Sequence, residues 1–284
     1  MNSNIIQERQ NDETLLKVQY AARKCFNSAE KYNYFSLVVC MISGLSVLSP
    51  ESWNEDILNM IRFLLDIIAM LFCAIASNTS RWGATLRKYF DAQVIDICAN
   101  QFSESETQKI LEKAENIFLK NTEKAVSQIN NTGHDVPPGV KDWYEFSTPF
   151  DGVKAQFECQ KQNIWWTQKM MHRRLCMTVC LSIAIIFFFG VLIAITNHGA
   201  LSVLLCSGGI IFKIVERLVQ NIKYFYVSLL ILGSKIAVEA KPATENVERL
   251  QSLIDEFRSI NVQESNFIHQ KVAAKLSNLY QSTR

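Results

Sequence analysis

The sequence lacks the short motifs that mark the common enzyme classes. It contains no GxxxxGK phosphate-binding loop and no GxGxxG, GxSxG or HExxH pattern. Only four of its 284 residues are histidines, and the His134–Asp135 dipeptide is not joined by the further ligands that a metal phosphohydrolase needs. We therefore expect a protein that is not an enzyme, has no metal site and uses no cofactor in catalysis.

Two other patterns are missing. None of the eight cysteines forms a CxxC pair, and Cys176 and Cys180 share a helical face without a neighbouring His or carboxylate cluster, which argues against zinc. Strand-like alternation of apolar and polar residues is almost absent, which favours an all-α fold. The net charge is only +2, so the composition gives no reason to expect DNA or RNA as a partner.

Charged residues nearly disappear from four stretches and crowd together between them. The stretches cover residues 34–48, 57–76, 175–196 and 200–215. A helix needs about 20 apolar residues to cross a bilayer core of about 30 Å. A buried helix of a soluble domain is the alternative for any single stretch, but the four together predict an all-α integral membrane protein. Its four transmembrane helices form two hairpins that carry a helical cytoplasmic portion.

The charges between the stretches predict the orientation of the chain. The connection "SPESWNED" at residues 49–56 has three acidic residues and no Lys or Arg, and the other short connection is only "NHG". The opposite flanks are basic, so the positive-inside rule places both termini in the cytoplasm. The basic flanking residues are Arg23, Lys24, Lys31, Arg81, Arg87, Lys88, Lys169, Arg173, Arg174, Lys213, Arg217 and Lys223.

This topology divides the chain into five parts. They are a cytoplasmic amphipathic helix (1–33), the first transmembrane hairpin (34–76), a cytoplasmic helical region (77–174), the second hairpin (175–215) and cytoplasmic C-terminal helices (216–284). Ser103 and Glu106 have the spacing of a capping box, which predicts a helix start there. Apolar stripes on the cytoplasmic helices fit either core packing or an oligomer interface.

Two segments beside the predicted spans combine basic and aromatic residues. They read "RWGATLRKYFDAQVIDI" from Arg81 and "FECQKQNIWWTQKMMHRRL" from Phe157. Such residues commonly anchor a helix at the membrane surface. They can also bind a nucleotide, because guanidinium groups pair with phosphates and aromatic rings stack on bases. The candidate ligand-binding residues are Arg81, Trp82, Arg87, Lys88, Trp165, Trp166, Arg173 and Arg174.

The second predicted span contains two ionisable residues, Arg62 and Asp66. Each costs about 2.5 to 3.5 kcal/mol to insert alone. Their four-residue spacing places them on one helical face, so we expect them to pair. The pair either fixes helix packing or forms the lining or gate of a pore built from several copies.

Four segments in a fixed order resemble one bacterial family. They are "YAARKCFNSAEKYNYFS", "RWGATLRKYFDAQVIDI", "DWYEFS" and "CQKQNIWW", the last just before the third span. They resemble the four-transmembrane effectors associated with SMODS nucleotidyltransferases in CBASS anti-phage operons, over about residues 15–240. The resemblance implies an oligomeric protein of the bacterial inner membrane that responds to a cyclic oligonucleotide from the nucleotidyltransferase. It would then disrupt the membrane, causing abortive infection. A membrane scaffold that docks a soluble partner, without a pore, is the alternative.

Overall fold

Helices make up almost the whole of the described chain. The computed structural model describes residues 1–49, 53–195, 208–260, 275–276, 278–280 and 282, and these ranges contain no β-strand. This confirms the all-α prediction. The helices are α1 (Ser3–Gln10), α2 (Glu13–Leu45), η1 (Ser46–Leu48), α3 (Glu55–Ile95), η2 (Ala99–Gln101), α4 (Glu104–Leu119), α5 (Thr122–Asn130), α6 (Gly152–Ile195), α8 (Gly208–Ala240) and α9 (Thr244–Ser259).

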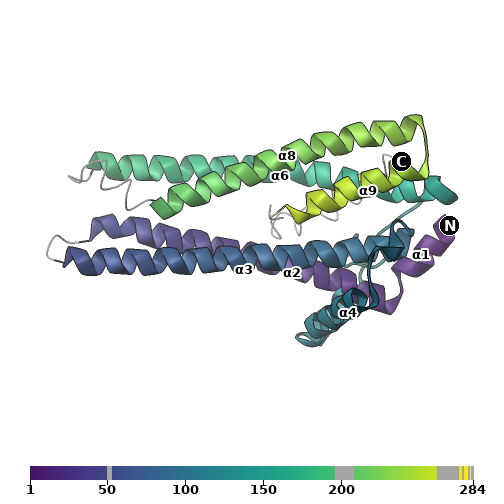
Figure 1. Cartoon of the computed structure of the whole chain (residues 1–284), viewed down its shortest axis with the longest axis horizontal. Coiled ribbons are helices and arrows are strands. Elements are labelled where there is room, and N and C mark those ends of the chain that lie inside the picture. The colour runs from purple at the N-terminus through teal and green to yellow at the C-terminus, as the bar shows by residue number, and fades with distance from the viewer. Residues whose placement is uncertain (50–52, 196–207, 261–274, 277, 281, 283–284) are drawn as a thin grey trace.

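Two long antiparallel hairpins lie side by side, α2 with α3 and α6 with α8 (Figure 1). At 1.5 Å per residue, the 41 residues of α3 span about 60 Å, twice the apolar thickness of a bilayer. The helix α2 likewise runs from the predicted cytoplasmic segment into the first predicted span without a break. Each hairpin therefore has one half that fits a membrane and one half that extends beyond it.

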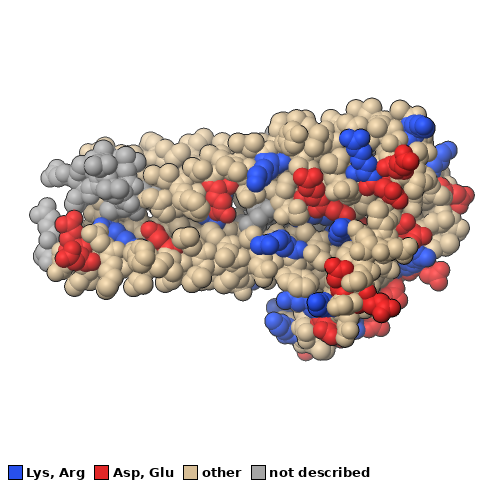
Figure 2. Space-filling model, in the orientation of Figure 1, with Lys and Arg blue, Asp and Glu red and all other residues tan. Residues whose placement is uncertain are grey.

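Four helices are long and apolar enough to cross a membrane, namely α2 with η1, α3, α6 and α8. This confirms the prediction of a four-span membrane protein. Figure 2 shows charged side chains gathered over the half that carries the termini, here named the charged half. The surface of the other half, here named the membrane half, is mostly uncharged. Part of the predicted fourth span, residues 200–207, and the "NHG" connection lie outside the described residues.

A small apolar core holds the two hairpins together in the membrane half. It contains residues of all four long helices, for example Leu37 of α2, Ala69 of α3, Phe189 of α6 and Ile210 of α8. Gly44 of α2 lies directly under Ile210 and Phe189, so the side chains of the second hairpin approach the backbone of the first. A Cβ at this position would lie 2.8 Å from the ends of both side chains, so a larger residue would displace at least one of them.

The charged half has a larger core, covered by the short helices. After α8, the chain turns back and α9 packs along it, with the rings of Tyr224 and Phe257 3.9 Å apart. The helix α4 starts at the predicted capping box, since Ser103 and Glu106 each bind the other's backbone amide. Helices α4 and α5 form an arm packed mainly on α2 (Figure 1).

Candidate functional site

A cavity of about 160 Å³ lies in the charged half, where five parts of the chain meet. Its walls come from α2, α3, α6, α9 and the connection between α5 and α6. Three arginines and four aromatic side chains reach it, and none of the described residues that line it is acidic. The basic and aromatic members are Arg23, Arg87, Arg258, Phe26, Trp143, Trp166 and Phe257.

Three of these side chains form a stack on one wall. The guanidinium of Arg87 lies 4.1 Å from the ring centre of Trp143, and the ring of Trp143 is stacked on that of Trp166 at 6.4 Å. The indole N–H of Trp143 donates a hydrogen bond to Asn163, which fixes the orientation of the middle ring. The stack therefore presents a preorganised cationic and aromatic surface to the cavity.

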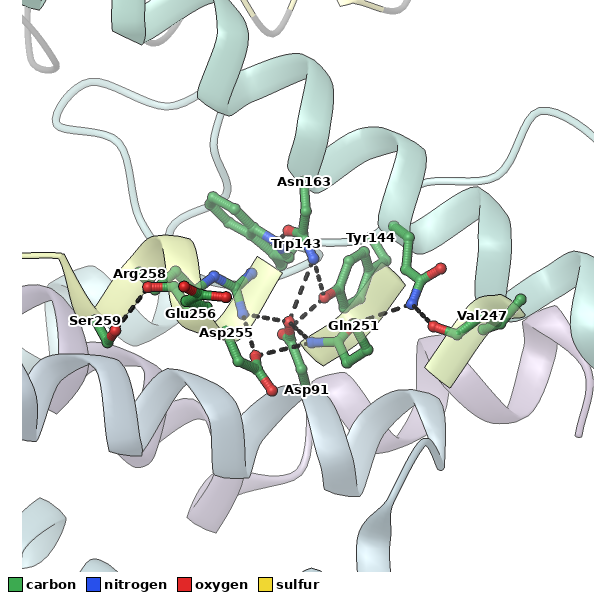
Figure 3. Close-up of polar contacts among 11 residues, drawn as sticks. Asp91, Trp143, Tyr144, Asn163, Val247, Gln251, Asp255, Glu256, Arg258 and Ser259 are labelled. Atoms are coloured by element: carbon green, nitrogen blue, oxygen red, sulfur yellow. Dashed lines mark hydrogen bonds and ion pairs between the residues drawn. The ribbon is translucent and has the colours of Figure 1, made fainter. Parts of the chain in front are cut away.

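Behind this wall lies a buried network centred on the carboxylate of Asp91 (Figure 3). Asp91 accepts hydrogen bonds from Arg258 at 2.6 Å and from the hydroxyl of Tyr144 at 2.7 Å. Asn163 and Gln251 donate to it as well, each at 3.3 Å. The network joins α3, α6, α9 and the connection before α6, and two of its members, Arg258 and Asn163, also face the cavity.

Burial changes the proton affinities in this network. Burial raises the pKa of Asp255 to about 6, although the charge of Arg258, 3.6 Å away, opposes the rise. Burial also raises the pKa of Tyr144 well above its usual value, and the charge of Asp91 adds to the effect. Tyr144 is therefore a neutral hydrogen-bond donor at any physiological pH.

The structure separates the eight residues that the sequence suggested for ligand binding. Among those whose side chains the structure describes, Arg87 and Trp166 reach the cavity described above and the others do not. Arg81 and Trp82 line a second cavity of about 310 Å³ between α3 and α4, together with Lys109 and Glu106. The two cavities share no lining residue, so a single ligand cannot use all eight candidates.

The remaining candidates lie away from both cavities or are not described. Lys88 faces the ring of Phe102, with 5.8 Å between its amine and the ring centre. Trp165 packs on Tyr280, with the ring centres 4.9 Å apart. Arg173 is exposed, and the side chain of Arg174 lies outside the described part of the chain. Trp165 therefore lies outside the cavity that Trp166 lines, although the two rings contact each other edge to face, with their centres 5.6 Å apart.

The expected ion pair between Arg62 and Asp66 is wrong. Arg62 donates instead to the hydroxyl and the carbonyl of Ser46, at 2.6 and 3.1 Å, and to Asn59 at 2.8 Å. Arg62 thereby provides a hydrogen-bond donor to a backbone carbonyl at the C-terminal end of α2, where the last carbonyl groups of an α-helix lack the usual amide donors. The spacing of residues along α3 cannot predict this contact with another helix. Asp66 instead faces α8. Its Oδ1 atom is buried without a hydrogen-bond partner, and it lies so close to Gly209 that a Cβ on that residue would be only 2.7 Å away.

A second polar cluster lies between the hairpins, one to two turns from Asp66. The amine of Lys213, only 2% exposed, donates to Glu216 at 2.7 Å, to Asn33 at 3.0 Å and to the thiol sulfur of Cys73 at 2.9 Å. The sequence suggested only a basic flank of the fourth span at Lys213. The partners come from α2, α3 and α8, so no local pattern marks the cluster.

The His134–Asp135 dipeptide belongs to a polar loop. The Nε2 atom of His134 lies 2.6 Å from Glu145, and Asp135 accepts hydrogen bonds from the backbone and hydroxyl of Thr132. No cluster of three or more His, Cys, Asp or Glu side chains suited to a metal occurs among the residues that the structure describes.

Comparison with known proteins gives one match. Residues 4–208 match the family model described as the SMODS-associating 4TM effector domain, which covers more than half of the chain and three of its four long helices in full. No curated protein and no solved structure matches the chain.

Proposed function

This chain belongs to the family of SMODS-associating 4TM effectors, and on that premise we propose that it is a ligand-gated effector of the bacterial inner membrane. The cavity lined by Arg23, Arg87, Arg258, Trp143 and Trp166 binds a cyclic oligonucleotide made by the partner nucleotidyltransferase. Binding rearranges the four spans of several assembled copies, and the membrane loses its barrier. The proposed activity requires no catalytic group.

The observation that carries this proposal is that three guanidinium groups and two indole rings converge on one cavity. No Asp or Glu occurs among the described residues that line it. Guanidinium groups bind phosphodiesters through paired hydrogen bonds, and a cyclic oligonucleotide has two or more such groups and no free end. Indole rings stack on nucleobases of any sequence, contributing about 1 to 3 kcal/mol per base. The membrane-anchor alternative explains a tryptophan near the membrane surface but not this convergence.

The position of the cavity explains how a ligand would act on the membrane. Arg23, Arg87 and Trp166 lie on α2, α3 and α6, and each of these helices continues into a candidate span. A ligand that draws these side chains together moves three spans directly. Arg258 adds a fourth contact, because a bound phosphate would compete with Asp91 for its guanidinium group.

The size of the cavity indicates that binding must change the structure. At about 160 Å³, it matches a cavity that holds a single aromatic ring. One base or one phosphate fits, whereas a complete cyclic oligonucleotide requires a wider opening. A ligand that binds only the widened state shifts the population toward it, which is the physical requirement for gating.

The test uses the purified full-length chain in liposomes loaded with a self-quenching dye. A panel of cyclic di- and trinucleotides is added from outside and inside, and dye release is followed alongside binding to the same protein in nanodiscs. We expect one member of the panel to bind and to release dye. Linear nucleotides of the same composition serve as the matched control.

The two readouts separate the parts of the proposal. Binding without release would retain the ligand site and reject the direct breach of the membrane. If the inserted, folded protein binds no member of the panel, the nucleotide site is rejected. Stoichiometric recovery of a soluble partner would then favour the scaffold function.

A further inference from the structure

The outer face of α8 carries an exposed apolar stripe with a seven-residue repeat. Its members alternate at steps of four and three residues, and their exposed fractions lie between 41% for Leu218 and 68% for Ile222. The same spacing extends back into the membrane half through Val215 and Ile211. The main members are Leu218, Ile222, Phe225, Leu229, Leu232 and Ile236. Such a repeat is typical of a coiled-coil seam. Phe212, Val219, Tyr226 and Leu230 are exposed as well and widen this apolar face on one side.

Lipid accounts for the first part of the stripe but not for the rest. Across the hairpins, Cys73 of α3 lies level with Lys213 and Glu216 of α8. The predicted span of α3 ends at Ala76, so the apolar part of the bilayer ends within about one turn of Glu216. By this predicted boundary, residues 222–236 lie outside the bilayer core, although they contribute to the apolar composition that makes α8 a candidate span.

The surroundings of this segment support that depth. Ser228 and Ile231 line a small cavity with Asn163, which itself binds the buried carboxylate of Asp91. In Figure 1, this part of α8 runs along the outer edge of the charged half, with α9 on its inner side. Exposed apolar rows of this length outside a membrane mark a protein interface.

We infer that the stripe on α8 pairs with the same stripe of a second copy, forming a parallel two-stranded coiled coil. Membrane insertion holds all copies at one depth and in one orientation, so identical stripes meet in register around a two-fold axis. The inference rests on the membrane topology of the proposed function and is independent of its ligand.

The residues within and beside the seam fit this occupant. In heptad terms, the a positions of the seam are residues 215, 222, 229 and 236, and three of them are β-branched (Val215, Ile222 and Ile236). The d positions include Leu218 and Leu232. This distribution favours two parallel strands.

Like charges do not oppose the pairing. Among the described residues at the heptad positions that border the seam, Lys235 is the one charged side chain, and it pairs with Glu239 of its own helix at 3.4 Å. The other bordering residues are Phe212, Val219, Tyr226, Gly233, Ile214, Asn221 and Ser228. Arg217 and Lys223 lie farther round the helix. A partner of different sequence could carry charges that match opposite charges beside this seam. Pairing between identical copies instead favours a border without charges, because each charge would meet its own copy.

The test compares two adjacent leucines by cross-linking in liposomes. Leu229 lies on the seam and Leu230 one residue off it, and both are exposed. Each is changed to cysteine in a chain whose exposed Cys98, Cys176 and Cys180 are serines. With a short bifunctional maleimide, L229C should give several-fold more covalent dimer than L230C or the parent chain. Equal yields would overturn the inference.

A second measurement does not depend on cysteine. The double variant I222E/L229E places two like charges on each seam, and because both sites are exposed, the helix content should not change. Its mass in nanodiscs or mild detergent should be half that of the wild type, while L230E keeps the wild-type mass. An unchanged mass would mean that the stripe is covered by another part of the chain or by another protein.

Dimers that form without any nucleotide response would reject the proposed ligand and leave this inference standing.

Discussion

Arg258 on α9 donates a hydrogen bond of 2.6 Å to the completely buried carboxylate of Asp91 on α3, across 167 positions of sequence. Asp91 lies on a helix that enters the membrane half, and Arg258 lies on a helix that does not. The same guanidinium group faces the cavity. This pair is therefore the structural link between the proposed ligand and the spans.

Removing one member of this pair should destabilise the protein strongly. The substitution Asp91→Asn leaves the guanidinium of Arg258 in a buried site without its main counter-charge, at a cost of about 3 to 5 kcal/mol. The thermal midpoint in detergent should fall well below that of the wild type. The double variant D91N/R258M, which leaves neither charge, should recover most of the loss. If the single and double variants melt together, the pair contributes no coupling.

The neighbouring carboxylate should behave in the opposite way. Because the folded pKa of Asp255 is about 6 and the ordinary value is 3.8, the folded state holds this proton more tightly than the unfolded state between about pH 4 and pH 6. Stability from this group is therefore lost as pH rises through that window. Asp255→Asn should stabilise the protein at pH 7 by about 1 to 3 kcal/mol and make no difference near pH 4. A difference that does not vary with pH would contradict this assignment.

Adjacent tryptophans provide a matched test of the ligand site. Trp166 lines the cavity and stacks on Trp143, whereas Trp165 packs on Tyr280. Trp166→Ala should weaken cyclic oligonucleotide binding by about 10- to 100-fold, because one stacked base loses its platform. Trp165→Ala removes a side chain of the same size that touches Trp166 edge to face but does not line the cavity, so it should reduce affinity much less than Trp166→Ala. Equal losses of affinity in titrations with both variants would contradict the cavity as the site.

Much of the helical architecture follows from local sequence, because its causes are local. A run of apolar residues predicts a span wherever it occurs, and the side chains of Ser103 and Glu106 predict a helix start because the two ends of the capping box are three residues apart. Arg87 and Trp166 were suggested for the same reason, since each has basic or aromatic neighbours along the chain.

The rest of the site depends on contacts between distant segments. Arg23, Trp143 and Arg258 reach the cavity from α2, the α5–α6 connection and α9, and none of them has a local pattern that points to a ligand. Arg62 shows how the local argument fails. Its spacing to Asp66 favours a pair, but the carbonyl of Ser46 at the end of the facing helix is a nearer acceptor.

Asp66 provides the test of a gate in the membrane half. Its Oδ1 is buried against Gly209 without a hydrogen-bond partner, so an ionised carboxylate there destabilises the resting arrangement of the hairpins. A change that hydrates this position would relieve the penalty, which biases the protein toward opening. Asp66→Asn should therefore raise the thermal midpoint by a few degrees and reduce ligand-dependent dye release at equal protein abundance.

Arg62→Gln is the control, because it removes the other intramembrane charge but loses a helix-end contact and should lower the midpoint. Unstable or poorly inserted Asp66→Asn protein would instead assign Asp66 to packing.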